Sequence, residues 1–228
     1  MSNIDQFVAG YERFHENYFA GETPLFGELS QGQNPSTMII ACSDSRVDPA
    51  IVMDAKPGDL FVVRNVANLV PPYEKGGGYH GVSAALEFGV CGLGVRHIMV
   101  MGHRQCGGIK ALTEGVPEGI DGEFIRPWVS MASHAYRRVK ADFPDASASE
   151  MACHCELAGI LVSLENLATF PFIKERVEAL STLADEMVSV RAQARIGETV
   201  RVLIEDAELQ EGRAAHQGPL VFKHLNPS

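Results

Sequence analysis

Residues 37–49 read TMIIACSDSRVDP, and this stretch decides the fold because an apolar run leads directly into chemically active side chains. The run TMIIA, residues 37–41, is typical of a buried β-strand. Two similar runs follow, LFVVRN at 60–65 and HIMVMG at 97–102, and each precedes a loop and a helical pattern. Strands that alternate with helices are typical of βαβ units. The sequence therefore predicts an α/β protein with a central, mostly parallel β-sheet flanked by helices.

The first 30 residues are predicted to form a helical arm. Apolar residues recur there at helical spacing, namely Ile4, Phe7, Val8, Tyr11 and Phe14. This pattern indicates an extended, amphipathic N-terminal helix whose apolar face reaches beyond its own core. Such a face favours exchange of the helix between subunits, so we expect deletion of residues 1–20 to weaken association.

The C-terminal half is predicted to be mainly helical. Residues 123–181 indicate two or three helices, broken at Pro144 and Pro171. The tail, 182–228, contains TVRVLIED, which predicts a further strand at the sheet edge. We interpret the chain as one domain over residues 1–228, with 182–228 as a C-terminal extension.

Composition limits the classes of function. The 228 residues include 19 lysines and arginines against 29 acidic residues, a formal net charge of −10 without a run of like charges. We therefore expect no nucleic-acid partner, no membrane partner and a small substrate. No apolar run approaches the roughly 20 residues that span a bilayer, and the N-terminus lacks a signal-peptide pattern, so a cytoplasmic location is predicted. The five cysteines are an odd number, which favours reduced thiols or metal ligands over disulfides.

Thiol and imidazole groups follow two of the predicted strands. Cys42 ends the strand at 37–41, and the sequence HRQC after the run at 97–102 supplies His103 and Cys106. In a parallel sheet these strand ends meet at one edge, where ligands collect. Two thiolates and an imidazole are ligands that zinc prefers, and three protein ligands leave a fourth tetrahedral position open for catalysis. The sequence therefore predicts a catalytic zinc site.

Asp44 and Arg46 lie two residues apart directly after Cys42. In an extended turn their side chains share a side and can pair. A carboxylate at the end of a buried strand is stable only when its charge is held. We therefore expect Arg46 to form an ion pair with Asp44 beside the metal.

Several motifs together resemble the β-class carbonic anhydrases over roughly residues 30–178. They are CSDSRV, GDLFVVRNVANLVPP, GVSAALEFGV, HIMVMGHRQCGGIKAL and CELAGILVSLENLATFPFIKERV. The resemblance implies one Zn²⁺ per chain bound by Cys42, His103 and Cys106, an Asp44–Arg46 dyad beside it, and reversible hydration of carbon dioxide to bicarbonate. It also implies a homodimer or a higher even homo-oligomer.

MIIACSDSR and VPPYEKGGGYHGV resemble the plant-like branch of this family. In that branch the substrate pocket would be lined by Gln33, Phe61, Val66, Phe88 and the backbone of Gly107. The branch often has Tyr where Phe88 stands, so one hydroxyl donor is missing here. The tail lacks the aromatic-rich strand that the family usually has after its RERV helix, and residues 182–228 are therefore a divergent extension.

The expected mechanism follows from the ion. Zinc lowers the pKa of a bound water, so hydroxide is available near neutral pH to attack carbon dioxide. Asp44, kept ionised by Arg46, would only accept a hydrogen bond from this nucleophile and so orient it. Two thiolates neutralise the Zn²⁺ charge and should acidify the water less than three imidazoles would, which favours mildly alkaline activity.

Other functions remain open from the sequence. Cys42 could perform nucleophilic thiol chemistry as in phosphatase loops, although its distance to the arginine is shorter than Cys-x₅-Arg. The chain could instead be a zinc or bicarbonate binder without turnover, or a hydrolase of carbon disulfide or carbonyl sulfide on the same fold. The sequence CHCE at 153–156 contains metal-ligating residue types, but neighbours on a helix point about 100° apart and cannot chelate together.

Overall fold

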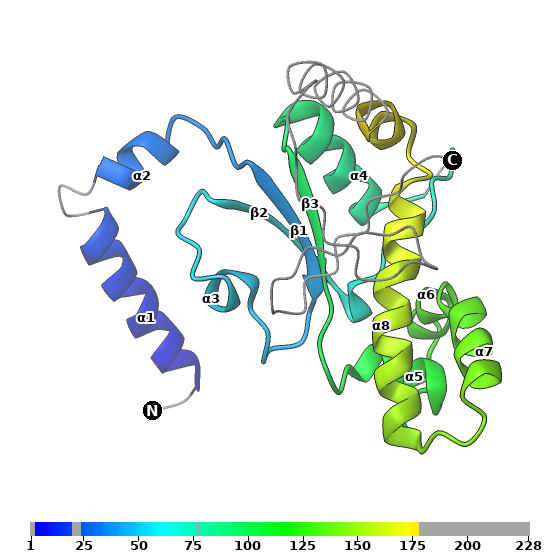
Figure 1. Cartoon of the computed structure of the whole chain (residues 1–228). Helices are drawn as coiled ribbons and strands as arrows, with labels where there is room; N and C mark the ends of the chain where they lie inside the picture. The colour runs from blue at the N-terminus through cyan, green and yellow to red at the C-terminus, as the bar shows by residue number, and fades with distance from the viewer. Residues whose placement is uncertain (1–2, 20–23, 77, 178–228) are drawn as a thin grey trace, which may run out of the picture. The chain divides into compact units, whose positions relative to one another are not determined.

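The computed structural model describes residues 3–19, 24–76 and 78–177. Its centre is a three-stranded sheet in the order β2–β1–β3, in which both pairs are parallel (Figure 1). The strands are β1 (Thr37–Cys42), β2 (Leu60–Asn65) and β3 (His97–Met101). The predicted α/β class and parallel sheet are confirmed. The predicted strand within 182–228 and the extension that contains it lie outside the described residues.

The burial of the strands explains this order. Met38, Ile39, Ile40 and Ala41 of β1 are fully buried, and a strand that is apolar on both faces suits the centre of a covered parallel sheet. The flanking strands are more accessible in the described residues. Val62 of β2 and Met99 of β3 are each about 40% exposed.

Eight labelled α-helices surround or precede the sheet in the described part of the chain. They are α1 (Asn3–Tyr18), α2 (Pro24–Leu29), α3 (Pro49–Val52), α4 (Gly81–Glu87), α5 (Gly107–Thr113), α6 (Ile125–Ser130), α7 (Ser133–Asp142) and α8 (Ala148–Leu167). A 3₁₀ turn, η1 (Val66–Asn68), follows β2, and a π-helical segment, η2 (Phe88–Gly92), continues α4. Helical residues Pro171–Val177 follow α8.

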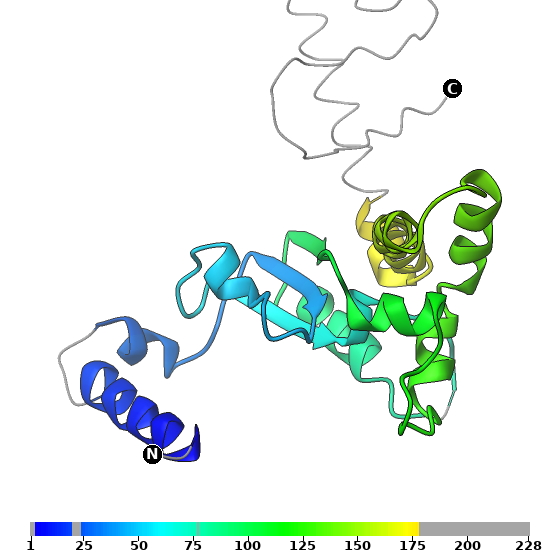
Figure 2. The same cartoon turned by 90° about the horizontal axis from the view of Figure 1, so that it is seen from below.

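The long helix α8 begins after the break predicted at Pro144. The Ser147 side chain accepts a hydrogen bond from the Glu150 backbone N–H, and the Glu150 carboxylate accepts one from the Ser147 N–H. This reciprocal capping box satisfies two donors at the helix start. Seen along its axis, α8 lies beside β3 and against α5 and α7 (Figure 2).

Two apolar clusters attach the helices to the sheet. The first joins β1 to α4 and the end of α8 and contains Met38, Ile40, Val70, Leu86, Val90, Val95, Leu167, Phe170 and Ile173. The second, here called the site cluster, contains Cys42, Ala67, Leu69, Cys106, Ile109, Ala132, Val139 and Cys155. Burial of each large apolar side chain contributes about 1.5–3 kcal/mol. The site cluster holds two cysteines of the predicted metal site within packed structure.

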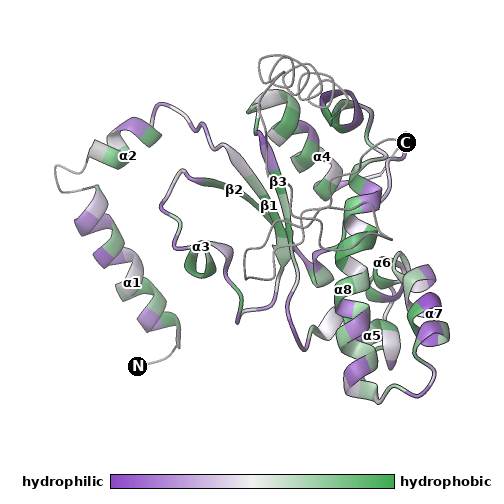
Figure 3. Cartoon of the chain, viewed as in Figure 1, coloured by the Kyte–Doolittle hydropathy of each residue, from purple (hydrophilic) through white to green (hydrophobic). Residues whose placement is uncertain are grey.

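The predicted N-terminal helix is confirmed as α1. Its apolar residues recur between polar ones (Figure 3). Phe14 contacts Phe26 of α2 edge to face, with ring centroids 5.5 Å apart. Phe7 and Tyr11, by contrast, are about two-thirds exposed. The part of the apolar face that contains Phe7 and Tyr11 is therefore left exposed by the described part of this chain.

No single helix among the described residues is both long and apolar enough to cross a membrane. Only Ala148–Leu167 taken together with Pro171–Val177 meets that length and composition, and these two helices are bent by 90°. The core helix of a globular protein meets the same criterion.

Candidate metal centre

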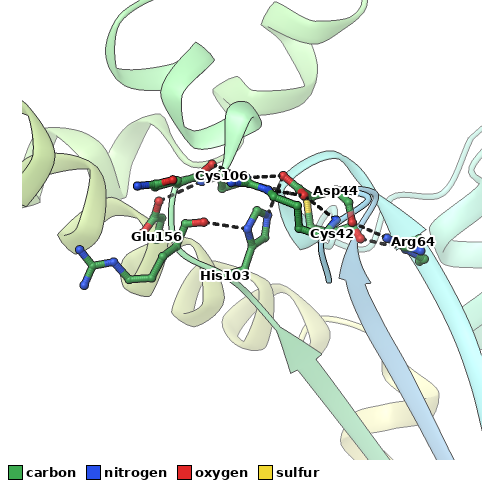
Figure 4. Close-up of polar contacts among 9 residues, drawn as sticks. Cys42, Asp44, Arg64, His103, Cys106 and Glu156 are labelled. Carbon is green, nitrogen blue, oxygen red and sulfur yellow. Dashed lines mark hydrogen bonds and ion pairs between the residues drawn. The ribbon is translucent and has the colours of Figure 1, made fainter. Parts of the chain in front are cut away.

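The sheet register brings the predicted metal ligands to one edge (Figure 4). Cys42 is the last residue of β1, and its neighbour Ala41 pairs with Met101 at the end of β3. His103 follows Met101 by two residues, and Cys106 is the residue from which α5 begins. The parallel arrangement of β1 and β3 therefore juxtaposes groups that are 64 residues apart in sequence.

The three side chains form a site of suitable size for a metal ion. Cys42 Sγ, Cys106 Sγ and a ring nitrogen of His103 all lie within 4.8 Å of one another, and in the described residues they are the only such group. The two sulfur atoms are 3.8 Å apart. Two zinc–sulfur bonds of 2.3 Å at a tetrahedral angle span about 3.8 Å. The separation of the thiols thus fits a tetrahedral zinc site.

His103 presents an unused nitrogen to this site. Its Nδ1 lies 2.9 Å from the Arg104 carbonyl oxygen, which can only accept, so Nδ1 carries the proton and donates. The other nitrogen, Nε2, is the one buried side-chain polar atom without a hydrogen-bond partner among the described residues. A buried polar atom without a partner is costly. Ligation of a metal by Nε2 satisfies it, and the Nδ1 contact fixes the required tautomer.

The two thiols interact strongly with each other. A hydrogen bond from Cys106, together with the backbone N–H groups of Asp44 and Ala67, lowers the pKa of Cys42. The pKa of Cys106 is raised, first because it donates this hydrogen bond and second because it is buried. Without a metal, the pair therefore keeps one proton between the two sulfur atoms. A bound cation would displace that proton, since thiolates are the ligating form.

Asp44 and Arg46 form an ion pair in the loop after β1. Arg46 Nε donates to Asp44 Oδ1 at 2.9 Å, and Arg46 Nη2 donates to Oδ2 at 2.7 Å. The Arg46 side chain holds the pKa of the Asp44 carboxyl well below its usual range. Asp44 Oδ2 lies 3.8 Å from His103 Nε2, so the carboxylate faces the potential ligand atoms. Arg46 Nη2 also donates to the Gln105 carbonyl oxygen at 3.0 Å and links the loops after β1 and β3.

Arg64 is a further residue of the site that the sequence reasoning missed (Figure 4). Its guanidinium donates to the carbonyl oxygens of Cys42 at 2.9 Å and Asp44 at 2.6 Å. It also forms an ion pair of 3.1 Å with Asp48. Arg64 thereby holds the backbone that leaves β1. An arginine within the apolar run LFVVRN was the available signal, because a charge near the end of a buried strand needs partners.

Glu156 of α8 is the second residue that was missed, and Figure 4 shows it beside Cys106. Its side chain accepts a hydrogen bond from the Cys106 backbone N–H at 3.0 Å, and the residue is 92% buried, with 8% exposed. Glu156 belongs to the CHCE sequence. That sequence lies on α8, and in the described residues the only group of ligand atoms close enough to hold a metal ion is Cys42, His103 and Cys106.

The predicted substrate-pocket residues fall into two groups. Val66 lies in the turn beside α5, and Gly107 is the first residue of α5. Phe61 instead lies four residues before Asn65, the partner of Cys42, which places it about 13 Å back along the strand. Phe88 contacts Phe61 there, with ring centroids 5.9 Å apart. Gln33 precedes the opposite end of β1, so this group is not brought to Cys42 within one chain.

A cavity of about 460 Å³ lies beside Cys106 and Arg46. Its lining is Arg46, Arg104, Gln105, Cys106, Lys110, Glu114, Ala148, Ser149, Ala152 and Glu156. Five of these ten side chains are formally charged. This polar cavity is therefore distinct in character from the apolar pocket that an uncharged substrate requires.

The close contact of α5 with the turn after β2 depends on the absence of a side chain at Gly108. A Cβ at this position would lie 2.6 Å from Val66 Cγ1, 2.9 Å from Ala67 Cβ and 3.2 Å from the Ala67 backbone nitrogen. Gly108→Ala is therefore expected to lower the free energy of unfolding by about 1–3 kcal/mol, as overpacking does. Urea denaturation measures this change.

Gly107→Ala is the matched control, because a Cβ there meets nothing within 4 Å. Its free energy of unfolding should stay within about 0.5 kcal/mol of the unsubstituted protein. Equal stability of the two variants would contradict the close contact at Gly108.

Comparisons with known proteins agree with this geometry. The family model described as carbonic anhydrase matches residues 37–190. Beta carbonic anhydrase 3 of Arabidopsis thaliana is 38% identical over 179 residues, which cover 78% of this chain and 69% of that protein. The chain belongs to the β-carbonic anhydrase family. The predicted family and enzyme class are thereby confirmed.

Solved β-carbonic anhydrases share the fold. The structure of the β-carbonic anhydrase CcaA has a TM-score of 0.68 at 34% identity, covering 78% of this chain and 85% of that chain. A tetrameric β-carbonic anhydrase of Sordaria macrospora has a TM-score of 0.62 at 26% identity, covering 78% of this chain and 87% of that chain. These similarities confirm the predicted α/β architecture.

Proposed function

We propose that this β-carbonic anhydrase reversibly hydrates carbon dioxide to bicarbonate and a proton, with one Zn²⁺ per chain held by Cys42, His103 and Cys106. The observation that carries the proposal is the convergence of one ligand atom each from Cys42, His103 and Cys106 within 4.8 Å, and the buried Nε2 of His103 has no hydrogen-bond partner. Family membership supports the substrate.

Some of the protein residues would bind the zinc ion, and others would orient the reacting groups. The sulfur atoms of Cys42 and Cys106 and an imidazole nitrogen of His103 would supply three of the four ligands of a tetrahedral zinc ion, which would leave one position for water. The chemistry that a bound zinc ion supplies is the acidification of a water molecule, so that a nucleophile forms near neutral pH. Backbone N–H groups of Gly108 and Ile109 at the start of α5 hydrogen-bond to Cys106 and stabilise its thiolate.

Asp44 orients the nucleophile in this proposal. Because Arg46 keeps the carboxylate ionised, its oxygens can accept but never donate a hydrogen bond. The nucleophile must therefore direct its proton to Asp44 and its lone pair away, toward the carbon of carbon dioxide. Addition of hydroxide to this carbon forms bicarbonate, and the proton lost by water passes to solvent or buffer.

The substrate pocket is proposed to need a second copy of the chain. Val66 and Gly107 lie on the elements that flank the metal-ligating residues, whereas Gln33, Phe61 and Phe88 belong to the other end of the strands. A partner subunit that brings its own such residues to this edge would complete an apolar pocket. The proposal fits an even homo-oligomer, and a similar β-carbonic anhydrase of Sordaria macrospora is tetrameric.

Zinc analysis combined with stopped-flow hydration of carbon dioxide tests the proposed function. We expect about one zinc per chain, as a three-ligand catalytic site requires, and rapid hydration. Carbonyl sulfide and carbon disulfide, assayed with the same preparation, should be turned over far more slowly. Faster turnover of either sulfur compound would assign the chain to that reaction, and zinc without any turnover would indicate a binding protein.

Thiol catalysis at Cys42 has less structural support. Cys42 is 4% exposed and its sulfur faces Cys106, whereas a nucleophilic cysteine must reach its substrate. Thiol catalysis at Cys42 would also give His103 and Cys106 no role.

The exposed face of α1 is predicted to contribute to subunit association. Phe7→Asp combined with Tyr11→Asp places two charges on residues that are 69% and 66% exposed. The substitutions should leave the fold of one chain intact but raise the dissociation constant of the oligomer by about tenfold or more, as loss of aromatic interface anchors does. Sedimentation velocity over a concentration series measures this change.

Glu16→Gln, a polar exchange on the same helix, serves as the control and should associate normally. A full-length protein that stays monomeric at all concentrations would contradict both the role of α1 and the shared pocket.

A further inference from the structure

We propose that Trp128 is a positioning residue for Cys42. Its indole N–H holds the peptide unit between Val66 and Ala67, and the N–H of that same unit donates to the Cys42 sulfur. The inference rests on the proposed role of Cys42 as a zinc ligand. It assigns a function in the metal site to α6, a helix that supplies no ligand itself.

The contacts form a short chain from α6 to the sulfur atom. Trp128 Nε1 donates to the Val66 carbonyl oxygen at 2.7 Å. The Ala67 N–H, in the same peptide unit, hydrogen-bonds to Cys42. The described peptide bonds are all trans, so the carbonyl and the N–H of this unit point in opposite directions. A hydrogen bond at the carbonyl thus fixes, and further polarises, the N–H that faces the sulfur.

The turn needs such a restraint because its backbone is unusual. Ala67 has φ 64° and Asn68 has φ 47°, in the left-handed region that residues with a side chain seldom adopt. A flip of the Val66–Ala67 peptide would return Ala67 to negative φ. The same flip would turn the Val66 carbonyl oxygen toward the Cys42 thiolate and remove its donor. The hydrogen bond from Trp128 is present only in the unflipped peptide and opposes this change.

Neighbouring contacts restrain the ends of the turn, and the hydrogen bond from Trp128 restrains the Val66–Ala67 peptide. The Asn65 side chain bonds both the N–H and the carbonyl of Leu69 at 2.9 Å, which closes the turn around η1. Gly108 allows the turn to lie directly against α5. Trp128 itself packs against the site cluster. A role confined to packing would depend on the indole ring, whereas positioning depends on its N–H.

The single tryptophan of the chain permits a test of that difference. Production of the full-length protein in a tryptophan auxotroph with 3-benzothienylalanine replaces the indole N–H by sulfur at residue 128 alone and keeps the ring shape. Incorporation of 5-fluorotryptophan, which retains the N–H, is the matched control. Trp128→Phe provides a genetic variant without the donor.

The first measurement is zinc affinity by competition with a chelator. Direct outer partners of metal ligands contribute about 10- to 100-fold to affinity, and Trp128 acts through one intervening peptide, so the benzothienyl protein should bind zinc about 3- to 10-fold more weakly. Trp128→Phe should show at least this loss. The fluorinated protein should stay within about twofold of the natural one by the same reasoning.

The second measurement is the sulfur-to-metal charge-transfer band of the cobalt-substituted proteins. A thiolate that receives a weaker hydrogen bond is easier to oxidise, so the band should move to longer wavelength in the benzothienyl protein and in Trp128→Phe. The fluorinated protein should keep the natural band.

Three outcomes would overturn the inference. They are unchanged affinity in the benzothienyl protein, reduced affinity with an unmoved charge-transfer band, and an equal loss in the fluorinated control. The second outcome would assign Trp128 a purely structural role. If the natural protein bound no zinc, the proposed function itself would be refuted. That failure is distinguishable from failure of the Trp128 inference, because it is seen in the natural protein before Trp128 is replaced.

Discussion

Cys106→Ser is expected to lose zinc and carbon dioxide hydration together. The serine hydroxyl stays protonated where a thiolate is required, so only two of the three ligand side chains, Cys42 and His103, remain. After dialysis the zinc content should fall from about one per chain to nearly zero, and kcat/KM by at least about 10³-fold, because water ionisation then lacks the metal. Elemental analysis and stopped-flow hydration measure the two effects on one preparation.

The control for this variant is Cys91→Ser. Cys91 is an exposed cysteine of η2 and lies outside the ligand group. Its substitution should preserve the zinc content, which separates ligation from a general sensitivity to thiol loss. Full zinc retention in Cys106→Ser would remove Cys106 from the metal site and with it the proposed geometry.

Asp44→Asn is expected to keep zinc and yet lose activity, because the three ligands remain. The asparagine side chain can reach the same place, but its NH₂ group cannot accept the hydrogen bond that aims the nucleophile. We expect kcat to fall by about 10²- to 10³-fold, within the range for a positioned proton acceptor.

The pH dependence of activity distinguishes the orienting role of Asp44 from ionisation of the nucleophile. Because the Asp44 pKa is held well below its usual range by Arg46, the folded protein binds fewer protons there than the unfolded chain. The stabilisation from this pair is present above the unfolded pKa of about 4 and is lost as the pH falls through the depressed pKa. Asp44 therefore stays ionised at neutral pH, so the rise of activity that we expect toward alkaline pH would belong to another group.

Arg46→Ala removes the other partner of the Asp44–Arg46 ion pair. Without its two hydrogen bonds from Arg46, the Asp44 carboxylate is free to turn toward His103 Nε2 and the metal, whose open position a carboxylate can fill. We expect normal zinc content, a carboxylate as fourth ligand by X-ray absorption, and loss of turnover. Asp44→Asn combined with Arg46→Ala removes that ligand. Unimpaired turnover in Arg46→Ala without carboxylate ligation would contradict the role of the pair.

The sheet and the grouping of Cys42, His103 and Cys106 were predictable because their signals are local. The apolar runs at 37–41, 60–65 and 97–102 specify strands through their residue types, and parallel pairing then places whatever follows them at one edge. Cys42 and His103 could be associated in this way without coordinates. The pairing of Asp44 with Arg46 followed from a spacing of two residues.

The roles of the supporting residues were not predictable because their partners are backbone groups distant in sequence, even though the charge of Arg64 in an apolar run indicated that it needs partners. Arg64 donates to two carbonyl oxygens 20 and 22 residues away, and Glu156 accepts from an N–H 50 residues away. A carbonyl or an N–H is present at nearly every position, so its involvement leaves no mark in the residue types. Trp128 escapes notice for the same reason, since it bonds the backbone of Val66 across 62 residues.

The register of β1 also determines where the chain tolerates changes in length. Each residue of Thr37–Cys42 faces a fixed partner on β2, so one inserted or deleted residue would shift Cys42 by about 3.3 Å and turn its side chain to the opposite face. The loop between α5 and α6 pairs with no strand, and a Cβ at Gly115 or Gly119 there would meet nothing within 4 Å. Loop grafts, affinity tags and circular-permutation sites therefore belong in this connection, whereas an indel in β1 would destroy the metal centre even in a chain that still folds.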